Sequence, residues 1–250
     1  PKNGCAMVWD NGNYIYVLAG DSYDSTTRFG FWRYNISGDF WENLENTPID
    51  QGPGQTLAWY ENDDGQFIFA WIGTTSSSDD AGTGCSEFWR YNLQTGHWDE
   101  NLAHVARHTS AGSIPYGSDD GSSLVWAGDE NYLYYLVGAH TEERTGPDES
   151  HFLRYNIKTK SWEELAPIPY NGLSTEENGV DDGGSLVWAG GDYLYAYKGG
   201  DGDGSNPADN FYRYSISENL WENLPGVPEG DMGGYNGCRL AVAGGQIYFW

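Results

Sequence analysis

Basic residues are scarce in this sequence. Its 250 residues include 12 Lys and Arg against 37 Asp and Glu, which gives a formal net charge of -25 at pH 7. Binding to nucleic-acid backbones or to anionic membranes needs clustered Lys and Arg, so we expect neither kind of partner. The acidity is first of all a source of solubility, and acidic loops are in addition candidate ligands for divalent cations.

Long apolar runs and catalytic motifs are missing as well. No run of about 18 apolar residues occurs, so the sequence predicts no membrane-spanning helix and no membrane insertion. No leader pattern precedes the first expected strand, and if the protein is secreted we expect a mature or excerpted chain. The sequence has no Gly-x-Ser-x-Gly elbow, phosphate loop or Cys-x-x-Cys pair, so we expect a protein that is not an enzyme.

An internal repeat is the main feature that is present. Four segments open with an aromatic residue and contain Arg-Tyr, and eight residues after each Arg stands a Trp that precedes an acid. A block of apolar and aromatic residues, split by a Gly, Asn or Asp turn, precedes each copy in the manner of a hairpin. The Arg residues are Arg33, Arg90, Arg154 and Arg213, and the Trp residues are Trp41, Trp98, Trp162 and Trp221.

Each repeat unit therefore predicts four short strands, and no segment has a helical period. Four-stranded antiparallel units repeated at intervals of about 50 residues are typical of a β-propeller. We expect an all-β fold with a single domain over 1–250. Its blades are expected at approximately 1–50, 51–113, 114–175 and 176–230, with a partial, two-stranded fifth blade at 231–250.

The end of the second expected strand carries a family resemblance. Ala19-Gly20 and Gly199-Gly200, with the Tyr and Trp that follow at set spacing, resemble the Kelch repeat, although Ile72-Gly73 and Val137-Gly138 replace the Gly pair in units two and three. The resemblance implies blades around a central channel and leaves function to the loops. Galactose oxidases also have Kelch-like blades and are the alternative from the enzyme class. Their copper site needs Tyr and His ligands and a Cys cross-linked to a Tyr, and this set does not map onto the chain.

The repeated Arg and Trp side chains have two interpretations. One is a binding ring lined by the four Arg residues. The other, which we favour, is structural. Each Arg pairs with the acid on the next strand and ties blades together, and each Trp packs between blades because it buries a large apolar area.

Cysteine is also scarce, with three residues. Cys5 and Cys238 both follow Asn-Gly and occupy the same place in the first and fifth units. If five blades close a ring, these units are neighbours, so we predict a Cys5–Cys238 disulfide, the alternative being two buried thiols. A disulfide implies an oxidising compartment, and Cys85 then stays free or pairs between chains.

Two further motifs agree with a surface location. The oxygens of Asp201, Asp203 and Ser205 resemble the first half of a calcium loop, although Tyr212 stands where such a loop has its distal Glu. The sequence therefore establishes no cofactor, and calcium is the one candidate, with turn-forming Asp-Gly chemistry as the alternative. Asn35 opens an Asn-Ile-Ser sequon for N-glycosylation.

These features predict a non-catalytic scaffold or interaction module that is extracellular or at the cell surface. In one version it is a self-assembling subunit of a surface layer or filament, whose two-stranded fifth blade is completed by another chain at its strand edge. In the other it is a glycan- or protein-binding domain of a larger secreted protein. The two-stranded fifth unit favours the first version if the chain is complete; an excerpted sequence or a short fifth blade are the alternatives.

Overall fold

A computed structural model describes the fold over most of the chain. Every regular element that it describes is a β-strand. The strands form four four-stranded antiparallel sheets and one two-stranded sheet, so the prediction of an all-β protein with four full blades and a two-stranded fifth is confirmed. Within the described part, no helix is long and apolar enough to cross a membrane. The described residues are 4–20, 29–52, 54–73, 85–106, 121–129, 131–138, 151–169, 180, 183–199, 211–226 and 239–249.

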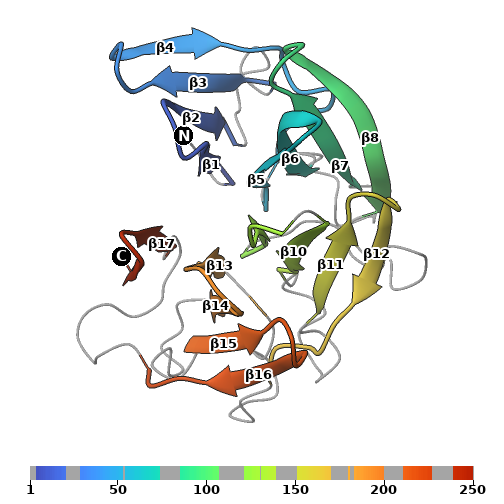
Figure 1. Ribbon diagram of the computed structural model, residues 1–250. Helices are drawn as coiled ribbons and strands as arrows, with labels where there is room; N and C mark the ends of the chain where they lie inside the picture. Colours follow the sequence, from blue (N-terminus) through green and yellow to red (C-terminus); the bar gives the residue numbers. More distant parts are fainter. Residues whose placement is uncertain are drawn as a thin grey trace. The chain divides into compact units, whose positions relative to one another are not determined.

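The chain divides into two compact units, and the first, Pro1–Asp119, contains two sheets. In each sheet the strands follow one another in chain order from one edge to the other (Figure 1). The first sheet consists of β1 (Ala6–Trp9), β2 (Tyr14–Leu18), β3 (Phe31–Asn35) and β4 (Phe40–Asn43). The second consists of β5 (Thr56–Asn62), β6 (Gly65–Gly73), β7 (Cys85–Asn92) and β8 (His97–Ala106).

The second unit, Asp120–Trp250, contains the other three sheets. The third sheet consists of β9 (Ser123–Trp126), β10 (Tyr132–Leu136), β11 (Phe152–Asn156) and β12 (Ser161–Glu164). The fourth consists of β13 (Ser185–Trp188), β14 (Tyr193–Tyr197), β15 (Phe211–Ser215) and β16 (Leu220–Asn223). The fifth is the hairpin of β17 (Leu240–Ala243) and β18 (Gln246–Phe249).

The strand register lines up four residues across every four-stranded sheet, with a Trp at each end. Directly opposed residues of antiparallel neighbours share a face of the sheet, so each set lies on one face, and we call it the tryptophan row. The rows are Trp9, Ile15, Tyr34 and Trp41 in the first sheet; Trp59, Ile68, Tyr91 and Trp98 in the second; Trp126, Leu133, Tyr155 and Trp162 in the third; and Trp188, Leu194, Tyr214 and Trp221 in the fourth.

The turn between the third and fourth strands has the same construction in each of these sheets. Its last residue has a positive φ, which Gly, Asn and Asp adopt more readily than other residues. In the first sheet the Asn35 side chain closes the turn, because its Oδ1 accepts the Gly38 N–H at 2.8 Å. The positive-φ residues are Asp39 (54°), Gly96 (75°), Lys160 (55°) and Asn219 (51°).

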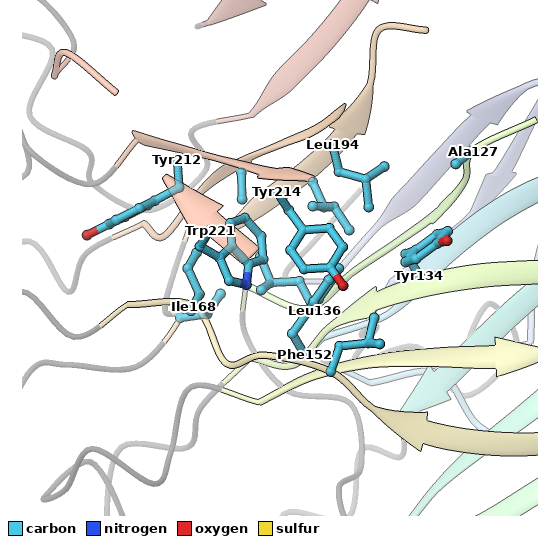
Figure 2. Close-up of a cluster of buried hydrophobic side chains, with 13 residues drawn as sticks. Ala127, Tyr134, Leu136, Phe152, Ile168, Leu194, Tyr212, Tyr214 and Trp221 are labelled. Atoms are coloured by element: carbon cyan, nitrogen blue, oxygen red, sulfur yellow. The ribbon is translucent and has the colours of Figure 1, made fainter. Parts of the chain in front are cut away.

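Aromatic side chains make the core between the third and fourth sheets (Figure 2). Phe152 of β11 lies T-shaped against Tyr214 and Trp221 of the fourth sheet, with ring centroids 4.8 and 5.0 Å apart. Leu136 and Leu194 are fully buried in the same cluster. Such ring pairs contribute about 0.5–1.5 kcal/mol each beyond the area that they bury, so this junction is a main source of stability in the unit.

The first strands of successive sheets also approach closely. The Leu186 N–H of β13 donates to the hydroxyl of Ser123 on β9 at 3.0 Å, and the Leu240 N–H of β17 donates to the hydroxyl of Ser185 at 3.1 Å. A Cβ added at Gly184 would lie 2.5 Å from the main-chain oxygen of Gly121, so the close approach requires glycine there. These contacts hold the first strands of the third, fourth and fifth sheets against one another.

Candidate functional site

Two sheets hold their tryptophan rows against the sheet that precedes them in the chain. In the second unit, the Trp221 indole donates from Nε1 to the main-chain oxygen of Ala166 at 2.8 Å, and its ring meets Phe152. In the first unit, the Trp98 indole donates to the main-chain oxygen of Glu45 at 3.2 Å, and its ring lies 5.1 Å from Phe31. The row is therefore a contact surface between sheets.

The tryptophan row of the first sheet is exposed instead. Trp9 is 50% exposed and Trp41 is 60% exposed, whereas Trp221 is 6% exposed. Met7, two residues before Trp9 on β1 and thus on the same face, is 68% exposed. We call the surface made by Met7, Trp9, Tyr34 and Trp41 the aromatic face.

The other face of the first sheet is covered at Phe31 and Tyr16, although Phe40 on that face is 47% exposed. Phe31 is 1% exposed because it packs against Tyr91 and Trp98 of the second sheet, at 5.0 and 5.1 Å between ring centroids. Tyr16, on the same side as Phe31, is 1% exposed, and burial raises its pKa to about 12. The apolar side chains of its strands that are at least half exposed, Met7, Trp9 and Trp41, thus lie on the surface that makes contacts in the second and fourth sheets.

Polar groups lie at the edges of the aromatic face. The Tyr34 hydroxyl donates to Oδ1 of Asp39 at 2.5 Å, and this hydrogen bond to a carboxylate raises the pKa of Tyr34 above its usual value. The Trp9 indole donates to the main-chain oxygen of Gly12 at 3.0 Å, within the β1–β2 turn. Flat rings beside a carboxylate suit the recognition of a partner.

The four predicted Arg residues lie within their own sheets. Arg33 pairs with Glu42 of the adjacent strand at 2.6 Å, and its guanidinium lies 4.3 Å from the ring centroid of Tyr14 on the other neighbouring strand. Arg90 pairs with Asp99 and Glu100, Arg154 with Glu163, and Arg213 with Glu222, each over an aromatic ring of the same sheet. The expected partner on the next strand is present, but these ion pairs join strands of one sheet rather than two blades.

The four predicted Trp residues have different surroundings. Trp98 and Trp221 contact the preceding sheet, as described above. Trp162 meets Tyr135 and Tyr155 of its own sheet, at 5.9 and 5.0 Å between ring centroids. Trp41 meets Tyr34 of its own sheet at 5.1 Å.

The remaining predicted sites are tested only in part. Cys5 is a free, exposed cysteine, and Cys238 lies outside the described residues, so the disulfide stays a prediction. Asp201, Asp203 and Ser205 also lie outside them. Among the residues that are described, no group of three or more His, Cys, Asp or Glu is arranged to hold a metal ion. Asn35 is the last residue of β3, its Oδ1 accepts a hydrogen bond from Asn13 at 2.8 Å, and its glycosylation stays a prediction.

Sequence reasoning did not single out Met7, Trp9, Tyr34 or Asp39, and it assigned Trp41 to packing. The local sequence carries no signal that separates Trp41 from Trp221, since each stands eight residues after the Arg of its own repeat. Their difference arises from the neighbour that covers one of them.

Comparison with known proteins supports the fold. No family model matches the chain, and no curated protein matches it. Many solved structures match, among them one titled "Structure of YjhT", with a TM-score of 0.63 and 14% sequence identity over 100% of this chain and 71% of that one. The chain therefore has a β-propeller fold. At this identity the likeness concerns the fold alone.

Proposed function

We propose that this protein is a non-catalytic interaction module of the extracellular space or the cell surface, built on a Kelch-like propeller. The observation that carries the proposal is the aromatic face. The same register positions make contacts between sheets at Trp98 and Trp221, and at Trp41 they are open. An exposed apolar patch rimmed by polar groups is typical of an interaction site.

The composition of the face also favours binding. Trp, Tyr and Met are enriched in protein interfaces, and large rigid rings lose little conformational entropy when they are covered. The net charge of -25 keeps the protein soluble although it exposes these rings. The partner is accordingly a protein or a glycan rather than a nucleic acid or a lipid bilayer.

Site-specific photo-crosslinking in producing cells tests this function. A photoreactive phenylalanine analogue at Met7 lies on the aromatic face, and the same analogue at Gln94, in the exposed β7–β8 turn, is the matched control. We expect a discrete adduct from position 7 and none from position 94. Identical adduct patterns at the two positions, or none at position 7, would contradict the proposal.

Self-assembly is the second candidate, and one observation favours it. In the four larger sheets the second strand pairs with a third, whereas in the described residues β18 pairs with β17 alone. A strand edge with free main-chain groups is a template for another strand. This candidate makes the protein a subunit of a surface layer or filament.

The mass in solution separates the two candidates. Self-assembly through β18 predicts particles heavier than the 27.8 kDa chain in light scattering. Tyr248→Lys, which places a charge on the exposed edge strand, is expected to reduce that mass, and Met7→Lys on the aromatic face is expected to leave it unchanged. A monomer at all concentrations would remove this candidate without affecting the first.

A further inference from the structure

The turn between β1 and β2 sets a carboxylate against a main-chain nitrogen. Oδ1 of Asp10 accepts the Gly12 N–H at 2.7 Å and the Tyr14 N–H at 3.1 Å. The Trp9 indole donates to the main-chain oxygen of Gly12 at 3.0 Å. Both main-chain groups of Gly12 are therefore fixed by side chains, and its nitrogen lies beside a basic oxygen.

Asn11 precedes this glycine and has a left-handed conformation, with a φ of 58°. Asn11 and Gly12 are both exposed. In the third and fourth sheets the residue two positions after the Trp that caps the turn is a glycine, Gly128 or Gly190, with a φ of 74° or 98°. The turn is built there without an amide side chain at this position, so the amide of Asn11 is not a requirement of the fold.

An asparagine that precedes a glycine can react with the glycine nitrogen. Once the Gly12 nitrogen has lost its proton, it can attack Cγ of Asn11 and close a five-membered imide, and glycine adds no side chain that obstructs the ring. A main-chain N–H gives up its proton reluctantly, so removal of this proton limits the reaction. A general base acts at about 2.6–3.2 Å from the atom that carries the proton, and Oδ1 of Asp10 lies at 2.7 Å from the Gly12 nitrogen.

We propose that Asn11 is a self-modification site, at which Asp10 is the base that converts the Asn11–Gly12 pair into a succinimide. The Asp10 carboxylate takes the proton of Gly12, the freed nitrogen bonds to Cγ of Asn11, and the side-chain nitrogen leaves as ammonia with that proton. Water then opens the imide at one of its two carbonyl carbons and gives aspartate or isoaspartate. The reaction consumes water and no other reactant.

The corresponding turns of the second and third sheets contain only parts of this arrangement. In the third sheet, Oδ1 of Asp129 accepts the Asn131 N–H at 2.7 Å, but the residue between them in the sequence is Glu130, which has no amide to lose. In the second sheet, Oδ1 of Asn62 accepts the Asp64 N–H at 3.0 Å, and an acid rather than a glycine follows Asn62. Among the described turns between first and second strands, base, amide and glycine meet in the first sheet.

The two products differ in their effect on the turn. Aspartate adds one negative charge and keeps the main chain, whereas isoaspartate routes the main chain through the former side chain and lengthens it by one atom. The extra atom lies between Asp10 and its two main-chain partners, Gly12 and Tyr14, so we expect isoaspartate to release the Trp9 indole from Gly12. The modification therefore loosens the end of the β1–β2 hairpin.

Incubation of the folded protein in ¹⁸O-labelled water tests the site, because opening of the imide incorporates water oxygen at residue 11. Mass spectrometry of a digest measures both products, and we expect isoaspartate as well as aspartate. In urea the contact with Asp10 is lost, and Asn11 should react about tenfold more slowly, a modest part of what a positioned base contributes. The standards for the unfolded rate are the other Asn-Gly pairs of the sequence, at Asn3, Asn171, Asn178 and Asn236.

Asp10→Asn separates the base from the turn cap, because asparagine keeps an Oδ1 acceptor but is not a base. We expect the reaction at Asn11 to slow about tenfold in this variant. Asp10→Ser is the second variant, since a serine hydroxyl can also close such a turn. Asp129→Asn, the same exchange in the third sheet, is the matched control and should leave the rate at Asn11 unchanged.

An unchanged or faster reaction in both Asp10 variants would overturn the inference, because the carboxylate would then only cap the turn. Aspartate without isoaspartate would overturn it too, since that product indicates direct hydrolysis of the amide. The same holds if Asn11 reacts more slowly in the folded protein than in urea. In support of the inference, a second Trp9 indole signal should grow in NMR spectra with the isoaspartate fraction and should be absent in Asn11→Gly.

Discussion

Trp41 and Trp221 occupy the same position in two copies of one repeat, but they differ in how far they are exposed. Trp221 is 6% exposed, under Phe152 and hydrogen-bonded to Ala166, whereas Trp41 is 60% exposed. The two sheets have the same strand order, register and turn. Each repeat therefore encodes a surface that a neighbouring sheet can cover, and the presence of that neighbour decides whether the surface is buried.

Removal of these two side chains gives the largest expected contrast. Trp221→Ala deletes a buried indole and leaves a cavity beside Phe152, so we expect a loss of about 3–5 kcal/mol in unfolding free energy. Trp41→Ala removes an exposed ring and should cost less than about 1 kcal/mol. Urea denaturation followed by circular dichroism measures both. Equal losses would show that Trp41 is covered in solution and would break the comparison.

Lys198 is a buried basic residue directly after the second strand of the fourth sheet, and the equivalent residue of the first sheet is Ala19. Lys198 is 1% exposed, and burial lowers its pKa to about 8. Between pH 8 and 10 the unfolded chain then binds more protons than the folded one, so stability should rise by about 1–3 kcal/mol as the pH increases across this range. In the Lys198→Met variant we expect the midpoint of urea denaturation to change little between pH 8 and 10.

Buried tyrosines are expected to limit the rise of stability with pH at the alkaline end. Burial raises the pKa of Tyr16 in the first sheet and of Tyr134 in the third to about 12. Above pH 10 the unfolded chain loses these protons before the folded chain does, so stability should fall with further increase in pH, in wild type and Lys198→Met alike. A wild-type profile that is flat from pH 8 to 10 would contradict the assignment of the rise to Lys198.

The Arg ion pairs should be insensitive to whether a sheet is covered. Arg33→Lys and Arg154→Lys each replace a planar guanidinium that lies between an acid and an aromatic ring of its own sheet. Since both pairs are partly exposed, we expect losses of less than about 1 kcal/mol, equal within error, in thermal or urea unfolding. A loss several times larger would indicate that the guanidinium acts between sheets, as the sequence had suggested.

The smallest expected effect concerns the ionisation of Tyr34. Asp39→Asn keeps a residue that tolerates the left-handed turn but removes the charge, so the pKa of Tyr34 should fall toward its usual value. Titration of a ¹³C-labelled Tyr ring by NMR measures it. Tyr214, whose pKa is raised chiefly by burial, should be unchanged in this variant and serves as the internal control.

The sequence was sufficient to predict the strands, because the periodic aromatic residues and the Gly, Asn and Asp turns act within a few residues of one another. It also placed an acid opposite each Arg, as for Arg154 and Glu163. It did not reveal that these pairs remain within a sheet. Successive side chains of a strand point to opposite faces, and the repeat alone does not tell whether the Arg side chain meets the next strand or the next sheet. It could not separate Trp41 from Trp221 either, since exposure depends on side chains far away in the sequence.

The order in which the sheets cover one another has a consequence for folding during translation. In the second and fourth sheets the tryptophan row rests on a sheet made earlier in the chain, through Phe31 and Phe152 respectively. Every sheet is also closed by hydrogen bonds between strands that are consecutive in sequence. A nascent chain leaving the ribosome can therefore complete one sheet at a time. At these two junctions the preceding sheet can already be folded when the new tryptophan row packs against it.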